Sequence, residues 1–253
     1  MRLVSYNILD GGTDRADALL QVIEAQHPDI VVLVEADDRQ VVDRLAAGLK
    51  MEVLAGEGRK HGGAILSRWP IVESINYGLL RGEFVDLLLE ATVQGPDRTW
   101  TVTAVHLHPR ASEEAEDRRM REIDAILEIY AAHRAQGVEH LLAGDFNANS
   151  PIQQIVPEQC KPKTRQEMAA NGGKIPRRCI AKLLSAGYID VLQAVHGEAA
   201  GRMGSFTTEF PGQRIDYVFA YGIDPARFAE ARIETGPAAR DASDHFPLIV
   251  RII

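Results

Sequence analysis

The amino-acid sequence of this 253-residue chain predicts an α/β protein built on mixed β-sheets. Three stretches carry that prediction. Residues 3–34 show strand, helix and strand patterns in turn, which is the order of a βαβ unit. Residues 51–105 contain short apolar runs separated by Gly, Pro or Asp, as in antiparallel strands joined by turns. Residues 139–144 form a further buried-strand pattern after a long amphipathic helix.

Composition sets limits on the class of protein. Hydrophobic residues make up 45% of the chain, which suffices for a large core. The formal net charge of −8 excludes a uniformly basic nucleic-acid binder. A phosphorylated substrate is still compatible with this charge, because a bound divalent cation can supply positive charge locally. We expect one domain over residues 1–253, although the length also allows two small ones.

The sequence shows no membrane or secretion signal. No apolar run approaches the roughly 18 residues of a membrane helix, and the N-terminus enters a strand pattern without a signal peptide. We therefore expect a cytoplasmic protein without stable membrane association, and the oligomeric state stays open. Cys160 and Cys179 form no metal motif, so free thiols in a reducing compartment are expected, with one disulfide as the alternative.

The first predicted elements are a strand, a helix and a second strand. Residues 3–8 form a strand pattern that ends before a Gly pair, and apolar residues at helical spacing follow over 16–23. Residues 30–34 are entirely aliphatic, as expected of a strand buried on both faces. This strand ends at Glu35, and a second helix pattern follows over 41–49.

The middle of the chain predicts antiparallel strands and then one long helix. Four strand patterns separated by turn residues lie at 51–55, 63–67, 84–93 and 99–105. Apolar positions at helical spacing then predict a single amphipathic helix over 112–136, with Ser112 as its N-cap.

A basic segment follows the central strand, at residues 158–182. Its seven cations, against two acids, are Lys161, Lys163, Arg165, Lys174, Arg177, Arg178 and Lys182. A Gly pair and nearby prolines predict a loop with room for one short helix. The charges are explained either by an ordinary solvated loop or by a lid that contacts phosphate groups. In the second case Lys174, Arg177 and Arg178 are the expected substrate contacts.

The last third of the chain predicts a helix that ends at Gly187 and four strand patterns. The strand patterns lie at 204–208, 214–220, 227–234 and 248–253. Asp216 lies within the second of them, among apolar residues. A charge in that position is costly unless it is paired or hydrogen-bonded.

Polar side chains occupy the ends of these apolar runs. Asp145 and Asn147 follow the strand at 139–144, and at a spacing of two they point to the same side of an extended backbone. Gly, Asp and Asn also favour turns, so this stretch alone allows a simple turn. The full set at strand ends is Asn7, Glu35, His106, Asp145, Asn147, Asp216, Asp244 and His245. Two layered sheets whose strand ends meet at one rim would bring these residues together.

The residue types in this set indicate metal-assisted hydrolysis. Hard oxygen ligands without cysteine suit Mg²⁺, with Mn²⁺ as a substitute, rather than structural zinc. Histidines beside an inward-facing Asp suit a general base with an orienting partner. The sequence contains no P-loop, no G-x-S-x-G elbow and no H-E-x-x-H motif, so covalent serine catalysis and zinc proteolysis have no support.

An ordered set of motifs resembles the endonuclease/exonuclease/phosphatase superfamily, also called DNase I-like. The motifs are Ser5-Tyr6-Asn7, Val34-Glu35, Gly63-Ala64-Ile65-Leu66-Ser67-Arg68, Val105-His106-Leu107, Gly144-Asp145-Phe146-Asn147, Arg214-Ile215-Asp216-Tyr217 and Ser243-Asp244-His245-Phe246-Pro247-Leu248. The resemblance extends from residue 5 to residue 248. It implies a four-layer α/β sandwich, with two packed mixed β-sheets flanked by helices. It also implies Mg²⁺-dependent cleavage of a phosphoester by direct attack of water.

The resemblance further implies roles for the residues at the strand ends. Glu35 would be the main metal ligand, with Asn7 beside it and Asp244 completing the metal shell. Asp145 and Asn147 would position the attacking water and a phosphate oxygen.

Two histidines have implied roles as well. His245 would act as a base or stabilise phosphate charge, held by Asp216. His106 would contact the phosphate or assist the leaving group, whereas His108 matches no motif position and is only a neighbour. A partner carboxylate for His106 is not evident, and Glu83 and Asp86 are candidates.

The family resemblance leaves the substrate open, because similar cores cleave DNA, RNA, sphingomyelin, inositol phosphates, protein–DNA adducts and small nucleotides. The basic segment favours a polyanion, so we expect a nucleic-acid phosphodiester, although aromatic residues for base stacking are absent from that segment. A small phosphorylated molecule or a lipid head group is the alternative. A non-catalytic binding module is a further alternative, which the Glu35→Gln variant would distinguish.

Overall fold

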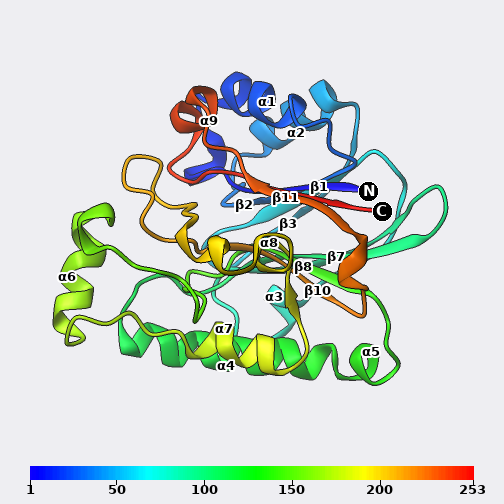
Figure 1. The fold of residues 1–253 in the computed structure, drawn as a ribbon. Helices are drawn as coiled ribbons and strands as arrows, with labels where there is room; N and C mark the ends of the chain where they lie inside the picture. Colours follow the sequence, from blue (N-terminus) through cyan, green and yellow to red (C-terminus); the bar gives the residue numbers. More distant parts are fainter.

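The computed structural model describes residues 1–253 and contains two six-stranded mixed sheets packed face to face (Figure 1). The first sheet has the order β11 (Phe228–Ile233), β12 (Leu248–Ile252), β1 (Arg2–Asn7), β2 (Ile30–Val34), β4 (Gly63–Ser67) and β3 (Glu52–Gly56). The second has the order β5 (Ile71–Asn76), β6 (Leu87–Gln94), β7 (Thr99–His106), β8 (His140–Asp145), β10 (Asp216–Tyr221) and β9 (Ile189–Asp190). Each sheet contains one parallel pair, β1 with β2 and β7 with β8.

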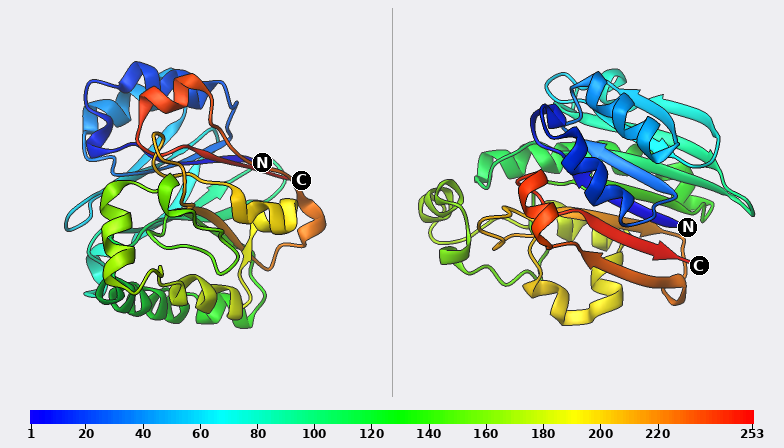
Figure 2. Two further views of the ribbon diagram at one scale, coloured as in Figure 1. Left: turned by 60° about the vertical axis from the view of Figure 1, so that its left-hand side comes forward. Right: turned by 90° about the horizontal axis from the view of Figure 1, so that it is seen from above.

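Helices cover the outer face of each sheet, which gives four layers (Figures 1 and 2). α1 (Ala16–Glu24), α2 (Arg39–Leu49) and α9 (Pro237–Ala242) pack on the first sheet, and α4 (Glu113–Ile129) and α7 (Arg178–Ser185) pack on the second. The shorter α-helices are α3 (Tyr77–Leu80), α5 (Ala131–Ala135), α6 (Pro162–Ala170) and α8 (Val191–His196). The 3-10 turns are η1 (Asp10–Gly12), η2 (Pro157–Gln159), η3 (Gly197–Arg202) and η4 (Pro225–Arg227). The predicted four-layer α/β sandwich is therefore confirmed. None of the helices is both long enough and apolar enough to cross a membrane.

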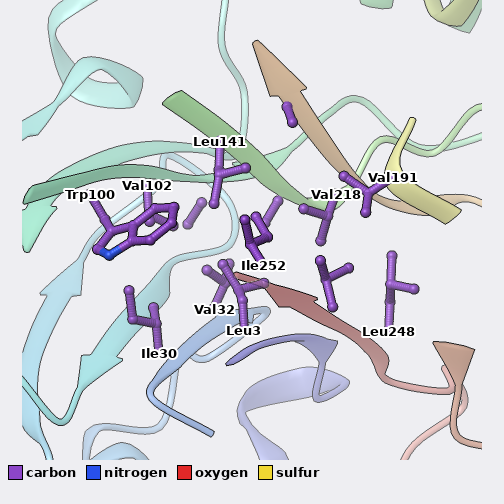
Figure 3. Close-up of a cluster of buried hydrophobic side chains, with 14 of the residues drawn as sticks. Leu3, Ile30, Val32, Trp100, Val102, Leu141, Val191, Val218, Leu248 and Ile252 are labelled. Atoms are coloured by element: carbon purple, nitrogen blue, oxygen red, sulfur yellow. The ribbon is translucent and has the colours of Figure 1, made fainter. Parts of the chain in front are cut away.

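Alternating side chains of the strands fill the layers on both sides of each sheet. In β2, Ile30, Val32 and Val34 face the other sheet, whereas Val31 and Leu33 face the helices. All five side chains are fully buried, which explains the uninterrupted apolar run. Figure 3 shows the inter-sheet cluster, where side chains from both sheets meet. Burial of each such side chain contributes about 1.5–3 kcal/mol, so this cluster holds the two sheets together.

The prediction of one long helix over 112–136 is wrong in one respect, because the structure has two helices there. α4 ends at Ile129 and α5 begins at Ala131. Between them Tyr130 leaves helical geometry, with φ −90° and ψ 11°. Its hydroxyl contacts Glu90 and Thr103 of the second sheet, so the helix breaks where this buried side chain is anchored.

Two other sequence predictions also differ from the structure, and one strand was missed. Residues 204–208 form no strand, since Phe206 alone makes isolated bridges to Gln213 and His245. β5 was not predicted, because its central side chains are exposed and lack a hydrophobic alternation. The basic segment is largely helical rather than a loop: it contains α6 and the start of α7.

Candidate active site

Four of the predicted site residues continue the rows of side chains that face the opposite sheet. Asn7, His106, Asp145 and Asp216 each lie an even number of positions from an inter-sheet core residue of the same strand. Those core residues are Leu3, Ala104, Ala143 and Val218. Because successive side chains alternate between faces, the four polar groups extend the inter-sheet layer at one end of the sandwich. The apolar core therefore gives way to a polar cavity.

Asp145 lies at the centre of this group. Within the second sheet it is in register with His106 on one side and with Asp216 on the other. From the first sheet, Nδ2 of Asn7 donates hydrogen bonds to Oδ2 of Asp145 at 3.1 Å and to Oε1 of Glu35 at 2.9 Å. These bonds connect the carboxyl ends of both parallel strand pairs.

Two site residues leave the strand alternation through left-handed backbone conformations. φ is +53° at Glu35 and +50° at Asn147, a region that is costly for residues other than glycine. The expectation that Asp145 and Asn147 share an extended backbone is wrong, because β8 ends at Asp145 and a turn follows. The turn is held by the N–H of Asn147, which donates to Oδ1 of Asp145 at 2.8 Å. At Gly144, φ is +143° and a Cβ would collide with the carbonyl oxygen of Val105, so only glycine fits there.

His245 lies in the loop between α9 and β12 and points toward Asp216. Its Nδ1 is 2.9 Å from Oδ2 of Asp216, and its Nε2 is 3.8 Å from Oδ2 of Asp145 and 3.9 Å from Oδ1 of Asp244. The ring of Phe206 packs against the imidazole, with 4.5 Å between centroids. Asp216 therefore fixes one ring nitrogen, and the other faces the cavity.

The two histidines are in opposite protonation states. Burial lowers the pKa of both, but at His245 the charges of Asp216 and Asp145 outweigh burial and raise the pKa to about 10. At His106 burial outweighs the charge of Glu35 and lowers the pKa to about 4. At neutral pH the site therefore contains one charged and one neutral imidazole.

The carboxylates at the site repel one another. Burial, and then the charge of Asp216, raises the pKa of Asp145 to about 8, and burial also raises the pKa of Asp244. At Glu35 burial acts in the same direction, but hydrogen bonds from Asn7 and from the backbone N–H of Asp10 lower its pKa overall. A cation placed among these groups would stabilise their charged forms.

The donor atoms fit a hard divalent cation. Glu35, His106 and Asp145 each place one potential ligand atom within 4.8 Å of the others, and Asp145, Asp216 and His245 form a second such group. Oδ1 of Asp244 is buried without a hydrogen-bond partner. Carboxylate and amide oxygens predominate over nitrogen, and sulfur is absent, which suits Mg²⁺ or Mn²⁺. The structure thus contains a candidate divalent-metal site.

Neither candidate partner of His106 forms a hydrogen bond with it. Glu83 is bound to Arg81 at the surface, and Oδ1 of Asp86 accepts the backbone N–H of His61 at 3.1 Å. Nδ1 of His106 and Oδ2 of Asp86 are both buried without a partner, and both residues line the site cavity of about 210 Å³. His108 does not line that cavity.

The three cations proposed as substrate contacts lie elsewhere and need correction. The guanidinium of Arg177 donates to the backbone carbonyls of residues 150, 151 and 153. Arg178 forms ion pairs with Glu113 and Asp117 of α4, and Lys174 lines a separate cavity beside Met168. The basic segment supplies a different residue, Lys161, to the site cavity.

Sequence reasoning did not assign six of the residues that line the site cavity to the site: Leu9, Lys60, His61, Pro109, Lys161 and Phe206. The ammonium of Lys161 lies 4.0 Å from the centroid of Phe206, which in turn packs on His245. Nδ1 of His61 lies 2.9 Å from Oδ2 of Asp37. His61 lies directly before Gly62-Gly63, where β4 begins, but neither glycine lines the site cavity.

The fold and site define a class of hydrolases that act on phosphate esters, and comparison with known families agrees. Residues 4–245 match the family described as the Endonuclease/Exonuclease/phosphatase family. This match spans nearly the whole sequence, so the chain belongs to that family and is a hydrolase of ester bonds. A search of curated proteins gives no significant match.

Solved structures with the same fold cover the whole chain. An AP endonuclease from Archaeoglobus fulgidus is 19% identical with a TM-score of 0.73, and the alignment covers 100% of this chain and 99% of that one. The 3' phosphatase NExo from Neisseria is 20% identical with a TM-score of 0.73, at 100% and 99% coverage. A humanized D. rerio TDP2 is 18% identical with a TM-score of 0.69, at 100% and 98% coverage. At these identities the similarity establishes the shared fold.

Proposed function

We propose that residues 1–253 act as one catalytic domain that hydrolyses a phosphodiester of nucleic acid with Mg²⁺, by direct attack of water. The observation that carries this proposal is the convergence of oxygen donors from both sheets around Asp145, next to one charged and one neutral imidazole. A phosphodiester needs positive charge at its non-bridging oxygens and a base near the attacking water.

Glu35, Asn7 and Asp244 are the proposed metal ligands. A divalent cation held by these residues would supply positive charge for the phosphate oxygens and acidify a water molecule. Asn7 has a second role, because its amide holds the carboxylates of Glu35 and Asp145 in place. Glu35 is itself oriented by the backbone N–H of Asp10, at 3.1 Å.

Asp145 and Asn147 are the proposed contacts for the attacking water and a phosphate oxygen. Without a cation the surroundings of Asp145 favour its protonated form, and a divalent cation at the site would keep the carboxylate ionised and able to accept a proton from water. The turn at Asn147 fixes its position, because its Nδ2 donates to the carbonyl of Leu107 at 2.9 Å.

The two histidines contact the phosphate from different elements, since His106 ends β7 and His245 lies in the loop before β12. Protonated His245, held by Asp216, donates from Nε2 to a non-bridging oxygen and stabilises the charge that develops there. Neutral His106, whose Nε2 lies 3.8 Å from both Glu35 and Asp145, contacts the phosphate near the leaving group. His245 therefore serves as the charge stabiliser and Asp145 as the base.

Nucleic acid is the preferred substrate for two reasons. One solved structure of the Neisseria phosphatase NExo holds a product DNA hairpin, and one of D. rerio TDP2 holds a single-stranded DNA product. Lys60 and Lys161 also place positive charge at the cavity of this chain.

A small phosphorylated molecule is the second candidate. Phe206 is the only Phe, Tyr or Trp side chain at the cavity, and its ring already contacts His245 and Lys161. Little aromatic surface is therefore available to stack a base.

The test is hydrolysis of a substrate panel in Mg²⁺ and in EDTA. The panel contains single-stranded DNA, duplex DNA, RNA, bis-p-nitrophenyl phosphate, p-nitrophenyl phosphate and an inositol polyphosphate. We expect nucleic acid to be cut in the presence of Mg²⁺ and not in EDTA, at rates that fall steeply as the salt concentration rises. Turnover of small phosphates alone would support the second candidate. Absence of all turnover, with binding retained in Glu35→Gln, would support a binding module instead.

A further inference from the structure

A second cavity of about 350 Å³ adjoins the active-site cavity. The two share five lining residues, which are Lys60, Pro109, Asn147, Lys161 and Phe206. A ligand group in the second cavity would therefore lie next to a group held by Asn147 in the first. We call the second one the adjoining cavity.

The adjoining cavity is strongly positive although the chain has a net charge of −8. Its charged lining residues are the cations Lys60, Arg110, Lys161 and Lys163 and a single acid, Glu167. Glu167 is already engaged, since Oε2 accepts the backbone N–H of Ala111 at 2.8 Å and Oε1 lies 3.7 Å from Arg110. None of the three lysines forms an ion pair with an acid, so their charges are available to a ligand.

The walls of the adjoining cavity are fixed by internal bonds. One wall is α6, and the other is the loop after β7, where Arg110 adopts φ +91°. Glu167 binds this loop as described, and Nδ2 of Asn171, at the end of α6, donates to the carbonyl of Ala111 at 2.8 Å. A guanidinium nitrogen of Arg119 donates to the backbone carbonyl of Arg110 at 2.6 Å. The positive charges therefore surround a preformed site rather than a loose surface.

We propose that the adjoining cavity binds a second phosphate group of the substrate, next to the one that is hydrolysed. This inference rests on the proposed function of the main site. Lys161 lies between the two cavities and lines both, so it contacts either phosphate. Lys163 lines the adjoining cavity but not the active-site cavity, so it is the residue that binds only the second phosphate. The preferred substrates are then molecules with at least two neighbouring phosphates, and isolated phosphoesters are poor substrates.

The second phosphate has two chemical sources. In nucleic acid it is the next phosphate of the backbone, and in a small molecule it is a second phosphate on the same scaffold. Both are tetrahedral anions that accept hydrogen bonds from ammonium and guanidinium groups. One pair of substrates for each source distinguishes the two.

The test compares paired substrates that differ by one phosphate. The nucleotide pair is thymidine 5'-(p-nitrophenyl phosphate) with and without a 3'-phosphate, and the small-molecule pair is an inositol bisphosphate and a monophosphate. For the wild-type protein in Mg²⁺ we expect kcat/KM to rise at least tenfold with the second phosphate in one of the pairs. The pair that responds identifies the source. Equal values within both pairs would overturn the proposal.

Matched variants assign the effect to the adjoining cavity. Lys163→Gln should reduce the ratio of kcat/KM within the responding pair about tenfold, because one charge-assisted contact is lost. Arg165→Gln is the control, because Arg165 has the same charge on the same helix, is exposed and lines neither cavity. The control should keep the wild-type ratio. An equal loss in both variants would indicate a general charge effect and would contradict the proposal.

A binding measurement separates this inference from the proposed function. Calorimetry in EDTA compares thymidine 3',5'-bisphosphate with thymidine 5'-monophosphate, and needs no turnover. Tighter binding of the bisphosphate that Lys163→Gln removes would support the second-phosphate site even if no ester is hydrolysed. Turnover of esters without any preference in binding or kcat/KM would leave the proposed function in place and overturn this inference.

Discussion

The amide of Asn7, at the end of β1 in one sheet, donates a hydrogen bond of 3.1 Å to the carboxylate of Asp145, at the end of β8 in the other. Both groups are buried, and the same amide also binds Glu35. The bond thus joins two halves of the candidate site that come from different layers.

The Glu35→Gln variant should bind divalent metal at least tenfold more weakly than the wild type. The change removes a negative charge and one hard oxygen ligand while the shape of the side chain is kept. Mn²⁺ titration followed by calorimetry measures the affinity. Asp43→Asn is the matched control, since Asp43 is an exposed acid on α2 that pairs with Arg39. Unchanged Mn²⁺ affinity in Glu35→Gln would contradict the assignment.

The Asp216→Asn variant should reduce kcat by about 10²–10⁴ with little change in KM. Asp216 is proposed to act through His245, whose Nδ1 it holds at 2.9 Å, and not through direct contact with the substrate. The amide of Asn is a weaker partner than the carboxylate of Asp, because it carries no charge to stabilise a protonated imidazole and orients the ring less firmly. Steady-state kinetics separates kcat from KM, and the proposal fails if the variant changes KM alone. Urea denaturation of the same variant checks that the fold is retained.

The Glu122→Gln variant should change how stability depends on pH. Burial raises the pKa of Glu122 from 4.5 to about 7 in the folded protein, where Oε1 has no hydrogen-bond partner. The folded state therefore favours the protonated acid. Its contribution to the free energy of unfolding is full below pH 4.5 and is lost as pH rises through 7. The amide cannot ionise, so the variant lacks this loss.

The free energy of unfolding of Glu122→Gln, relative to that of the wild type, should therefore increase between pH 5 and pH 8.5. The pKa shift of Glu122 corresponds to an increase of roughly 3 kcal/mol at most. Urea denaturation of both proteins at the two pH values measures the difference. A difference that is the same at both pH values would show that Glu122 ionises normally in the folded state.

The Arg214→Met variant should lower the free energy of unfolding by about 3–5 kcal/mol. The guanidinium of Arg214 is fully buried, binds Asp190 at 2.6 Å and lies over the ring of Tyr217. Its removal leaves the carboxylate of Asp190 buried and unpaired. Adding Asp190→Asn should recover most of the loss, because the amide has no charge and its oxygen can still cap α8. Thermal denaturation of the single and double variants tests this, and additive losses would argue against the pairing.

The alternation of side chains made much of the site predictable from the sequence. Asn7, His106 and Asp145 end apolar strands, and period-two spacing places them beside the inter-sheet core. Glu35 and Asn147 were also identified as polar residues after apolar strands, but their left-handed backbone was not evident, because neither residue type requires that conformation.

The partners of the arginines could not be predicted in the same way. Arg177 is in a charged run that suggests a solvated surface, yet it binds backbone carbonyls near residue 150. Backbone carbonyls have no residue-specific signature, so the sequence does not show which of them a distant guanidinium reaches. Lys161 was recognised only as one of seven cations, since its contact with Phe206 joins parts of the chain 45 positions apart.

The division of the site between two sheets has a consequence for folding. The first sheet is formed by residues from both ends of the chain, and the second by residues 71–221. An intermediate with only one sheet formed would hold Glu35 without Asp145, or Asp216 without His245. Hydrolysis would then return only after the two sheets pack against each other. The recovery of activity during refolding would therefore follow this packing step and not the formation of secondary structure. A chain with only one sheet formed would therefore lack a complete site.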